Sequence, residues 1–218
     1  MSTGISRRQL LGIVAAGTAA AVAAPFAQAA ARQTPPPDIP MLRRQAELAA
    51  EILGRKALES KSLIATAESL TGGLVSELIT GVAGSSAWFD RGFVTYQSKA
   101  KVEMIDVPEE MILEHGVVSE PVAEAMARGA VANSDANLAV ALTGLAGPSG
   151  GTPEKPVGTV CIGWARKTPE GGIVTRVRTI HAPGDRAAVR LEAAITALQG
   201  LIALLSGTDP RRMPCEWD

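Results

Sequence analysis

The spacing of hydrophobic residues along the chain alternates between a helical period and the continuous apolar runs of buried strands. Residues 41–58 carry apolar side chains at helical spacing, and a longer stretch of the same kind reaches about residue 205 after Asp185, which is suited to cap it. Short apolar runs predict buried strands at residues 62–66, 89–97 and 137–143. The chain therefore predicts helices and strands in alternation.

The remaining elements complete an α/β pattern. Shorter helices are expected at residues 71–80, 98–105, 108–115 and 119–132. Ser119 is a good N-cap for the last of these, and Pro121 fits its first turn. Residues 157–165 and 173–181 read as a hairpin with a polar turn. This order predicts a three-layer α/β/α single domain with a mixed sheet.

The first 29 residues differ from the rest because they contain no acidic residue. Arg7 and Arg8 precede an apolar stretch at residues 10–24, and the small-x-small sequence Ala27-Gln28-Ala29 follows. This pattern predicts a twin-arginine-type signal peptide and a periplasmic or exported protein. The apolar run is shorter than the roughly 20 residues of a membrane span. No stable membrane insertion is expected after removal of the signal.

The remainder divides into a Pro-rich tether at residues 30–39, a folded domain at residues 40–207 and a tail at residues 208–218. The formal net charge of −1 argues against a broad basic surface and against nucleic acid as a partner. Aromatic residues are only 3% of the chain, so the core must be built from Ala, Val, Leu and Ile. Cys161 and Cys215 do not form a disulfide framework.

A polar, Gly-containing turn follows the first predicted strand and precedes a helix. Backbone N–H groups in such a turn can hold an anion or a carbonyl oxygen, which makes Ser69, Thr71 and Gly72 candidate substrate-binding residues. The alternative is that Ser69 or Thr71 merely caps the helix, and the pattern alone favours that interpretation.

A second segment combines serines, a tyrosine and a lysine. Ser86 lies in the sequence Gly-Ser-Ser-Ala-Trp, and Tyr96 and Lys101 follow it. A serine needs a base to become nucleophilic, and a lysine can serve if burial lowers its pKa. The alternative is a turn serine and a solvated lysine. Ser98 also matches a Ser-x-x-Lys pattern with Lys101, but the motifs that usually accompany it are absent from this sequence.

A third segment, residues 143–159, is a long Gly/Pro-rich loop after the third strand. Its glycines allow a ligand to approach the backbone closely. The candidate substrate-binding residues are Thr143, Gly144, Ala146 and Gly147. A flexible loop without function is the alternative. The sequence is not a P-loop, because no Gly-Lys-Ser/Thr ends it.

Two arginines lie at the start of the last predicted helix. Arg186 and Arg190 are four residues apart, so they share a helix face and could clamp a phosphate. The alternative is ordinary surface charge paired with Asp185. His115 and His181 are far apart in sequence, and neither Cys/His ligand spacing nor a dinucleotide fingerprint is present. No metal and no cofactor are predicted.

These segments, in this order, resemble the CinA C-terminal domain family of nicotinamide-nucleotide amidohydrolases. The resemblance covers about residues 45–205 and rests on residues 66–69, 71–73, 84–89, 91–96, 115–122, 143–148, 155–160 and 183–186. Any one of these motifs is weak, but their order is specific. Leu70 stands where many relatives carry Cys.

The resemblance implies hydrolysis of nicotinamide mononucleotide to nicotinic acid mononucleotide and ammonia. It assigns Ser86 as the nucleophile, Lys101 as its base and Tyr96 as an assisting residue, with Ser69 as the competing nucleophile. It also implies a small-molecule nucleotide as the binding partner and a homo-oligomer, for which a dimer is expected. The larger N-terminal domain often fused in this family has no counterpart here, which favours a stand-alone deamidase over a role in competence.

Two other functions fit the same pattern less well. A nucleotide-binding protein without catalysis would not need Ser86, Tyr96 and Lys101 together. A hydrolase of another amide in the cell envelope would not need the pair Arg186 and Arg190. Both remain alternatives at this level.

Overall fold

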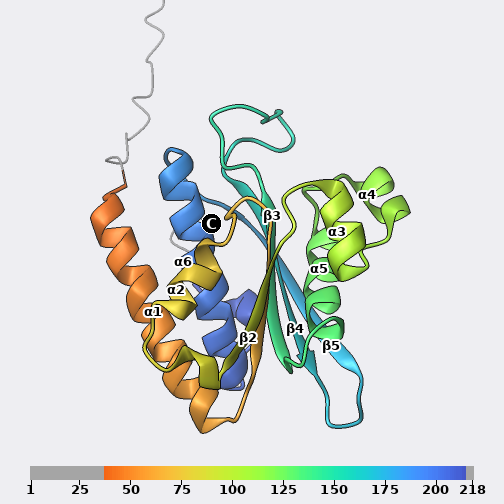
Figure 1. The fold of residues 1–218 in the computed structure, drawn as a ribbon. Helices are drawn as coiled ribbons and strands as arrows, with labels where there is room; N and C mark the ends of the chain where they lie inside the picture. Colours follow the sequence, from red (N-terminus) through yellow and green to blue (C-terminus); the bar gives the residue numbers. More distant parts are fainter. Residues whose placement is uncertain (1–36, 215–218) are drawn as a thin grey trace, which may run out of the picture. The chain divides into compact units, whose positions relative to one another are not determined.

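In the computed structural model, which describes residues 37–214, helices cover both faces of a five-stranded sheet (Figure 1). The helices are α1 (Ile39–Glu59), α2 (Leu74–Thr80), α3 (Ser98–Ile105), α4 (Glu109–His115), α5 (Glu120–Ala132) and α6 (Arg186–Leu205), with 3-10 turns η1 (Ser85–Ala87) and η2 (Pro210–Arg212). The strands are β1 (Ile64–Glu68), β2 (Phe89–Val94), β3 (Leu138–Gly144), β4 (Thr159–Lys167) and β5 (Ile173–His181). This arrangement confirms the predicted α/β fold with a mixed sheet.

Several predictions fall on residues that the structure does not describe. The predicted signal peptide at residues 1–29 lies outside the described residues, as do residues 30–36 of the predicted tether and residues 215–218 of the tail. Export through the twin-arginine route, the periplasmic location and the homo-oligomeric state all stay predictions.

The sheet order β2-β1-β3-β4-β5 determines which loops can form a site. Strands β2, β1 and β3 run parallel, whereas β4 pairs antiparallel with both β3 and β5. The carboxyl ends of the three parallel strands therefore meet at one edge of the sheet, where β4 begins and β5 ends. Ligands in open α/β sheets bind outside the carboxyl ends of parallel strands. This edge brings together the segments that follow β1, β2, β3 and β5.

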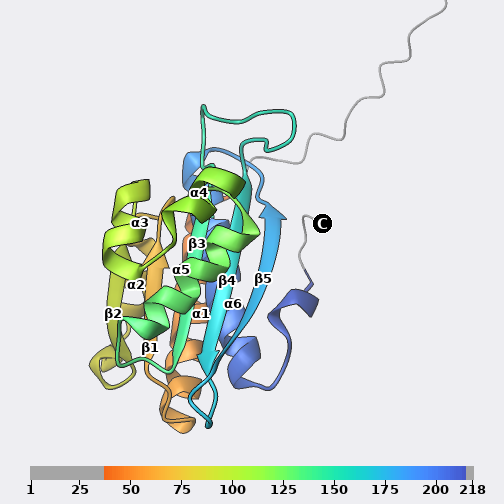
Figure 2. The ribbon, with the colours of Figure 1, turned by 90° about the vertical axis from the view of Figure 1, so that its right-hand side faces the viewer.

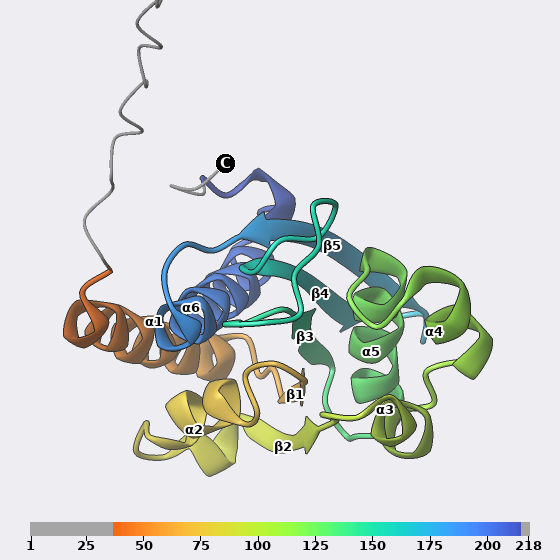
Figure 3. The same ribbon diagram turned by 90° about the horizontal axis from the view of Figure 1, so that it is seen from above.

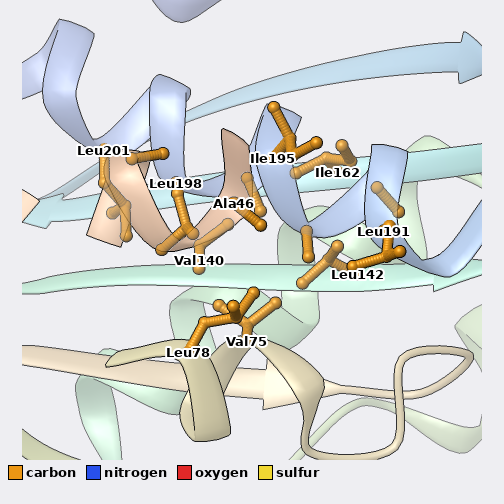
Figure 4. Close-up of a cluster of buried hydrophobic side chains, with 14 of the residues drawn as sticks. Ala46, Val75, Leu78, Val140, Leu142, Ile162, Leu191, Ile195, Leu198 and Leu201 are labelled. Carbon is orange, nitrogen blue, oxygen red and sulfur yellow. The ribbon is translucent and has the colours of Figure 1, made fainter. Parts of the chain in front are cut away.

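The two faces of the sheet carry side chains of different size. Helices α1, α2 and α6 cover one face, and α3, α4 and α5 lie on the other (Figures 2 and 3). Because side chains alternate along a strand, β3 turns its larger residues towards α1 and α6 and its alanines towards α5. Figure 4 shows Val140 and Leu142 of β3 beside Leu198 and Leu191 of α6, and Ile195 of α6 beside Ile162 of β4.

Small residues let α5 approach its neighbours at backbone distance. A Cβ added at Gly129 of α5 would overlap the carbonyl of Ile105 in α3, and one added at Gly163 of β4 would overlap the carbonyl of Ala123 in α5. Such overlap leaves no room for a side chain at either glycine. At these two points α5 meets α3 and β4 through main-chain atoms.

The observed boundaries differ from the predicted ones where polar groups are buried. Strand β1 ends at Glu68, two residues later than predicted, because the Glu68 carbonyl accepts from Thr95 N and continues the ladder with β2. Helix α1 begins at Ile39, inside the predicted tether, and the Asp38 side chain caps it. Ser119 occupies the predicted N-cap position of α5, but its hydroxyl donates to Gly116 O rather than accepting from the helix.

Helix α6 is the one described helix that is long and apolar enough to cross a membrane. Of its most apolar window, 72% is buried against the rest of the protein. Its apolar residues pack between α1 and the sheet, as expected for the core helix of a globular domain.

The contact between α6 and β4 gives a direct test of this packing. Trp164 of β4 donates its indole N–H to Ala197 O at 3.0 Å, and a Cβ added at Gly200 would overlap its ring. We expect Gly200→Ala to lower the free energy of unfolding, because overpacking of about 1–3 kcal/mol outweighs roughly 1 kcal/mol of helix propensity. Urea denaturation measures the change. The neighbouring exposed variant Gln199→Ala should shift stability by less than about 0.5 kcal/mol. A Gly200→Ala protein as stable as the wild type would contradict this packing.

Candidate active site

A cavity of about 330 Å³ lies at the carboxyl edge of the parallel strands. The segments after β1, β2 and β3 line it together with the start of α6. Among the predicted site residues, its lining contains Ser69, Tyr96, Lys101, Thr143, Gly144, Ala146, Gly147 and Arg186. Residues far apart in the sequence therefore form one site.

A second cavity, of about 400 Å³, lies between α3, α4 and α5. Its lining is mainly apolar, with Asp106, Glu124 and Arg128 as its charged residues. It contains no serine, cysteine or lysine. The need for a nucleophile beside a base therefore favours the cavity at the sheet edge.

Lys101 is the buried amine of this site. Only 1% of its surface is exposed, and its Nζ donates to Ser69 Oγ at 3.1 Å, to Thr95 O at 2.7 Å and to Tyr96 O at 3.4 Å. All three acceptors are neutral. Burial without a carboxylate partner lowers the pKa of Lys101 to about 8. The amine is still mainly protonated at pH 7, but its neutral form, which can accept a proton, is far more populated than in a solvated lysine.

Ser69 meets Lys101 because the backbone around it is fixed. Its N–H donates to Leu142 O at 3.0 Å, which carries the pairing of β1 with β3 one residue beyond the end of β1. Its carbonyl accepts from Gly72 N at 3.0 Å, and Gly72 and Gly73 have φ values of 58° and 98°. These positive φ values, which favour glycine, close the turn that leads from Ser69 into α2.

The structure does not bring Ser86 and Lys101 together, and this part of the prediction is corrected. Ser86 lies exposed in η1, immediately before β2, whereas Lys101 follows β2. The six residues of β2 span roughly 20 Å and carry the chain from one edge of the sheet to the other. The serine in contact with Lys101 is Ser69, the competing candidate. The sequence did contain a signal for this separation, because the strand predicted between Ser86 and Lys101 places them at opposite ends of the strands.

The two arginines of α6 reach the site loops. Arg186 donates to Gly147 O at 2.9 Å and to the Tyr96 hydroxyl at 3.1 Å, and so it bridges two loops across the cavity rim. Arg190 donates to Thr71 O at 2.6 Å, while its Nε is buried without a partner in the described structure. Every one of these acceptors is neutral. Both guanidinium charges therefore remain available to an anion.

Not every predicted substrate-binding residue lines the cavity. Thr71, Gly72 and Arg190 lie beside it rather than in its lining, linked through the bond from Arg190 to Thr71 O. The turn after β1 thus connects the cavity to the first turns of α6. Asp185 does not pair with either arginine, because its carboxylate accepts from Ala187 N and Ala188 N and caps α6.

An apolar wall completes the cavity, and most of it was not selected from the sequence. The residues that sequence reasoning left out are Leu70, Gln97, Val117, Val118, Leu145 and Ser149, whereas Ser98, which was weighed as a nucleophile from its spacing to Lys101, also lines the cavity. Thr143 Oγ donates to Val117 O at 2.6 Å, and Lys155 Nζ donates to Val118 O at 2.8 Å. These bonds tie the segment between α4 and α5 to the Gly-rich loop. The motif around His115 carried the only signal for this wall.

No group of three or more His, Cys, Asp or Glu side chains within residues 37–214 is arranged to hold a metal ion. The polar side chains that line the cavity are those of Ser69, Tyr96, Gln97, Ser98, Lys101, Thr143, Ser149 and Arg186. This donor set suits acyl transfer through an activated hydroxyl.

Comparison with known proteins identifies relatives of the whole site. The family model for the CinA C-terminal domain matches residues 46–205. A putative competence-damage inducible protein of Symbiobacterium thermophilum is 52% identical over 152 residues, which cover 68% of this chain and 36% of the relative. The protein named nicotinamide-nucleotide amidohydrolase PncC of Escherichia coli K12 is 50% identical over 151 residues, which cover 69% of this chain and 89% of the relative.

A solved structure shows the same fold. The competence/damage inducible protein CihA of Agrobacterium tumefaciens superposes with a TM-score of 0.67 at 42% identity, covering 73% of this chain and 95% of that one. The chain spans about a third of the length of the Symbiobacterium protein but most of the length of the Escherichia coli and Agrobacterium proteins.

The burial of Lys101 predicts a measurable titration. We expect its side chain to titrate with a pKa of about 8, followed by NMR of the ε-CH₂ group, with Lys101→Met assigning the signal. Because burial causes the shift, the Ser69→Ala variant should keep a similarly low midpoint. A midpoint near the ordinary value of 10.5 would show that the amine is solvated.

Proposed function

The chain belongs to the CinA C-terminal domain family, and from this we propose that it is a nicotinamide-nucleotide amidohydrolase that converts nicotinamide mononucleotide to nicotinic acid mononucleotide and ammonia. The observation that carries the proposal is the 3.1 Å contact between Lys101 Nζ and Ser69 Oγ in a cavity that also holds an unpaired arginine. The 50% identity to the protein named PncC supports the substrate.

Ser69 acts as the nucleophile and Lys101 as its base in this proposal. Neutral Lys101 takes the proton of the Ser69 hydroxyl while Oγ attacks the carboxamide carbon. The tetrahedral intermediate collapses as the lysine ammonium returns the proton to the amide nitrogen, the C–N bond breaks and ammonia leaves. Water, deprotonated by Lys101, then attacks the ester. This releases the carboxylate product and restores the Ser69 hydroxyl.

The backbone after Ser69 supplies donors for the negative charge that develops on the carbonyl oxygen. Among the described residues, none accepts a hydrogen bond from the N–H groups of Leu70 and Thr71. Both follow the nucleophile in a turn, but only Leu70 lines the cavity, so its N–H is the donor that lies beside the substrate. Donors that are fixed before the reaction lower the barrier more than solvent does, because they need no reorganisation.

Arg186 and Arg190 hold the 5′-phosphate in this proposal. Two guanidinium groups without carboxylate partners near the start of α6 favour a dianion. The apolar wall of Val117, Val118 and Leu145 suits the pyridine ring. Tyr96 contributes at the rim, where its hydroxyl accepts from Arg186 and its carbonyl accepts from Lys101.

The nucleophile is tested with two serine variants. We expect Ser69→Ala to reduce ammonia release from nicotinamide mononucleotide by at least about 10³-fold, because no acyl-enzyme can form. Ser86→Ala is the matched control and should stay within about twofold of the wild type. Full activity in Ser69→Ala, or its loss in Ser86→Ala alone, would overturn the assignment.

The pH dependence of the wild type follows from the pKa of Lys101. The base must be neutral, and below a pH of about 8 the amine is mainly protonated. The rate should therefore rise with pH on the acid side and level off above about 8. A bell-shaped or acid-favoured profile would point to another base.

The phosphate contact is tested by comparing two substrates. We expect Arg186→Gln to raise KM for nicotinamide mononucleotide about 10–100-fold, the value of a hydrogen bond to a charged group. KM for the nucleoside without the phosphate should change little. An equal rise in KM for both substrates would show that Arg186 does not bind the phosphate.

A further inference from the structure

A carboxylate with no exposed surface lies directly behind Ser69. Glu68 is 0% exposed, and both of its carboxylate oxygens accept hydrogen bonds. Its Oε2 accepts from Gly73 N at 3.0 Å and from Val75 N at 3.0 Å, and its Oε1 accepts from Ser76 N at 2.8 Å and from Ser76 Oγ at 2.7 Å. Four donors thus stabilise the charge of Glu68.

This carboxylate replaces the cap that α2 lacks. The N-cap position is Gly73, which has φ of 98° and no side chain to accept from the helix. The first N–H groups of a helix have no acceptor within the helix and carry a partial positive charge. Glu68 satisfies them from the strand that precedes the turn. One side chain therefore joins the end of β1 to the start of α2.

We propose that Glu68 is a positioning residue for Ser69. The turn of residues 69–73 leaves β1 and enters α2, and Glu68 holds the N–H groups at its far end. At the near end, Ser69 N is held by Leu142 O. With both ends fixed, Ser69 Oγ is kept against Lys101 Nζ, and the N–H group of Leu70, which lines the cavity, stays free for the substrate. This role rests on the proposed function of Ser69.

An ordinary cap would not make this connection. A Ser, Thr or Asp at position 73 would satisfy the start of α2 by itself. Here the acceptor belongs to the residue immediately before Ser69, so the position of α2 and the position of Ser69 depend on the same side chain. A displacement of about 1 Å in a catalytic group can reduce the rate by about 10²-fold.

The network continues to the edge strand of the sheet. Thr66 and Ser76 share a hydrogen bond of 2.7 Å between their hydroxyl groups, and Thr66 Oγ lies 3.5 Å from Glu68 Oε1. A Cβ added at Gly92 of β2 would overlap Ser76 Oγ and come within 2.9 Å of Thr66 Oγ. Gly92 therefore leaves the space that these hydroxyls occupy, which links three separated sequence positions to Glu68.

The proposal is tested with the full chain and the Glu68→Gln variant. The glutamine amide places N–H groups against the donors of α2, so at least one of its bonds must be lost. We expect kcat for nicotinamide mononucleotide to fall about 10²-fold while KM stays within about threefold of the wild type. Hydrogen exchange should accelerate about tenfold or more at the amides of Gly73, Val75 and Ser76.

Two further variants keep the test decisive. Ile195→Val, a core change beside Ile162 of β4 (Figure 4), lowers stability in general and should leave kcat and the exchange of α2 unchanged. Gly92→Ala disturbs Ser76 and Thr66 without altering Glu68, and should reproduce the fall in kcat. It replaces Glu68→Gln if that variant does not fold.

The outcomes separate the positioning role from the proposed function. Unchanged kcat in folded Glu68→Gln, or a loss no larger than that of Ile195→Val, would overturn the positioning role while the amidohydrolase stands. If the wild type releases no ammonia, the proposed function fails, and exchange at the three amides still decides whether Glu68 holds the turn. Unchanged exchange overturns the inference in either case.

Discussion

Two buried ionisable groups meet at the end of β1 without pairing with each other. The carboxylate of Glu68 faces only donors, whereas the amine of Lys101 faces only acceptors. An ion pair between them would keep the lysine charged and would withdraw the carboxylate from α2. Each group instead has neutral partners of its own. The amine of Lys101 therefore stays reactive and the turn after β1 stays rigid, although both lie at the same end of the strand. The arrangement depends on the register of β1 between β2 and β3, which sets where the polar residues leave the sheet.

The helices and strands of this fold were predicted well from the sequence, because residues buried on one face of an element recur at a regular spacing along the chain. The apolar stripe of α6 and the buried run of β3 define the sheet and its cover, and Asp185 marks the start of α6 as expected. The boundaries of β1 were less accurate, since a carboxylate such as Glu68 does not resemble a strand residue until its four donors are known. Apolar periodicity carries no information about such a polar network.

The site was predicted in part, and its error has a physical origin. Tyr96, Lys101, Arg186 and the Gly-rich loop after β3 share one cavity, but Ser86 does not. The choice of Ser86 came from the family resemblance, whereas contact with Lys101 depends on the direction of the strand between the two residues. The walls formed by Val117 and Val118 were missed because apolar residues in a connection give no chemical signal. Only the fold shows that Thr143 and Lys155 hold them in place.

The unequal faces of the sheet affect how the protein could be altered by random mutagenesis. On the side of α1 and α6, side chains of the size of Leu, Ile and Val interlock, and exchanges among them conserve volume. On the side of α5, the sheet contributes methyl groups such as those of Ala139 and Ala141 to the cluster, and Gly129 lies at a main-chain contact with α3. Enlarging any of these would push α5 outward, together with the wall that precedes it. A mutant library that aims at a wider substrate range should therefore include these positions, because they set the width of the cavity without touching the substrate.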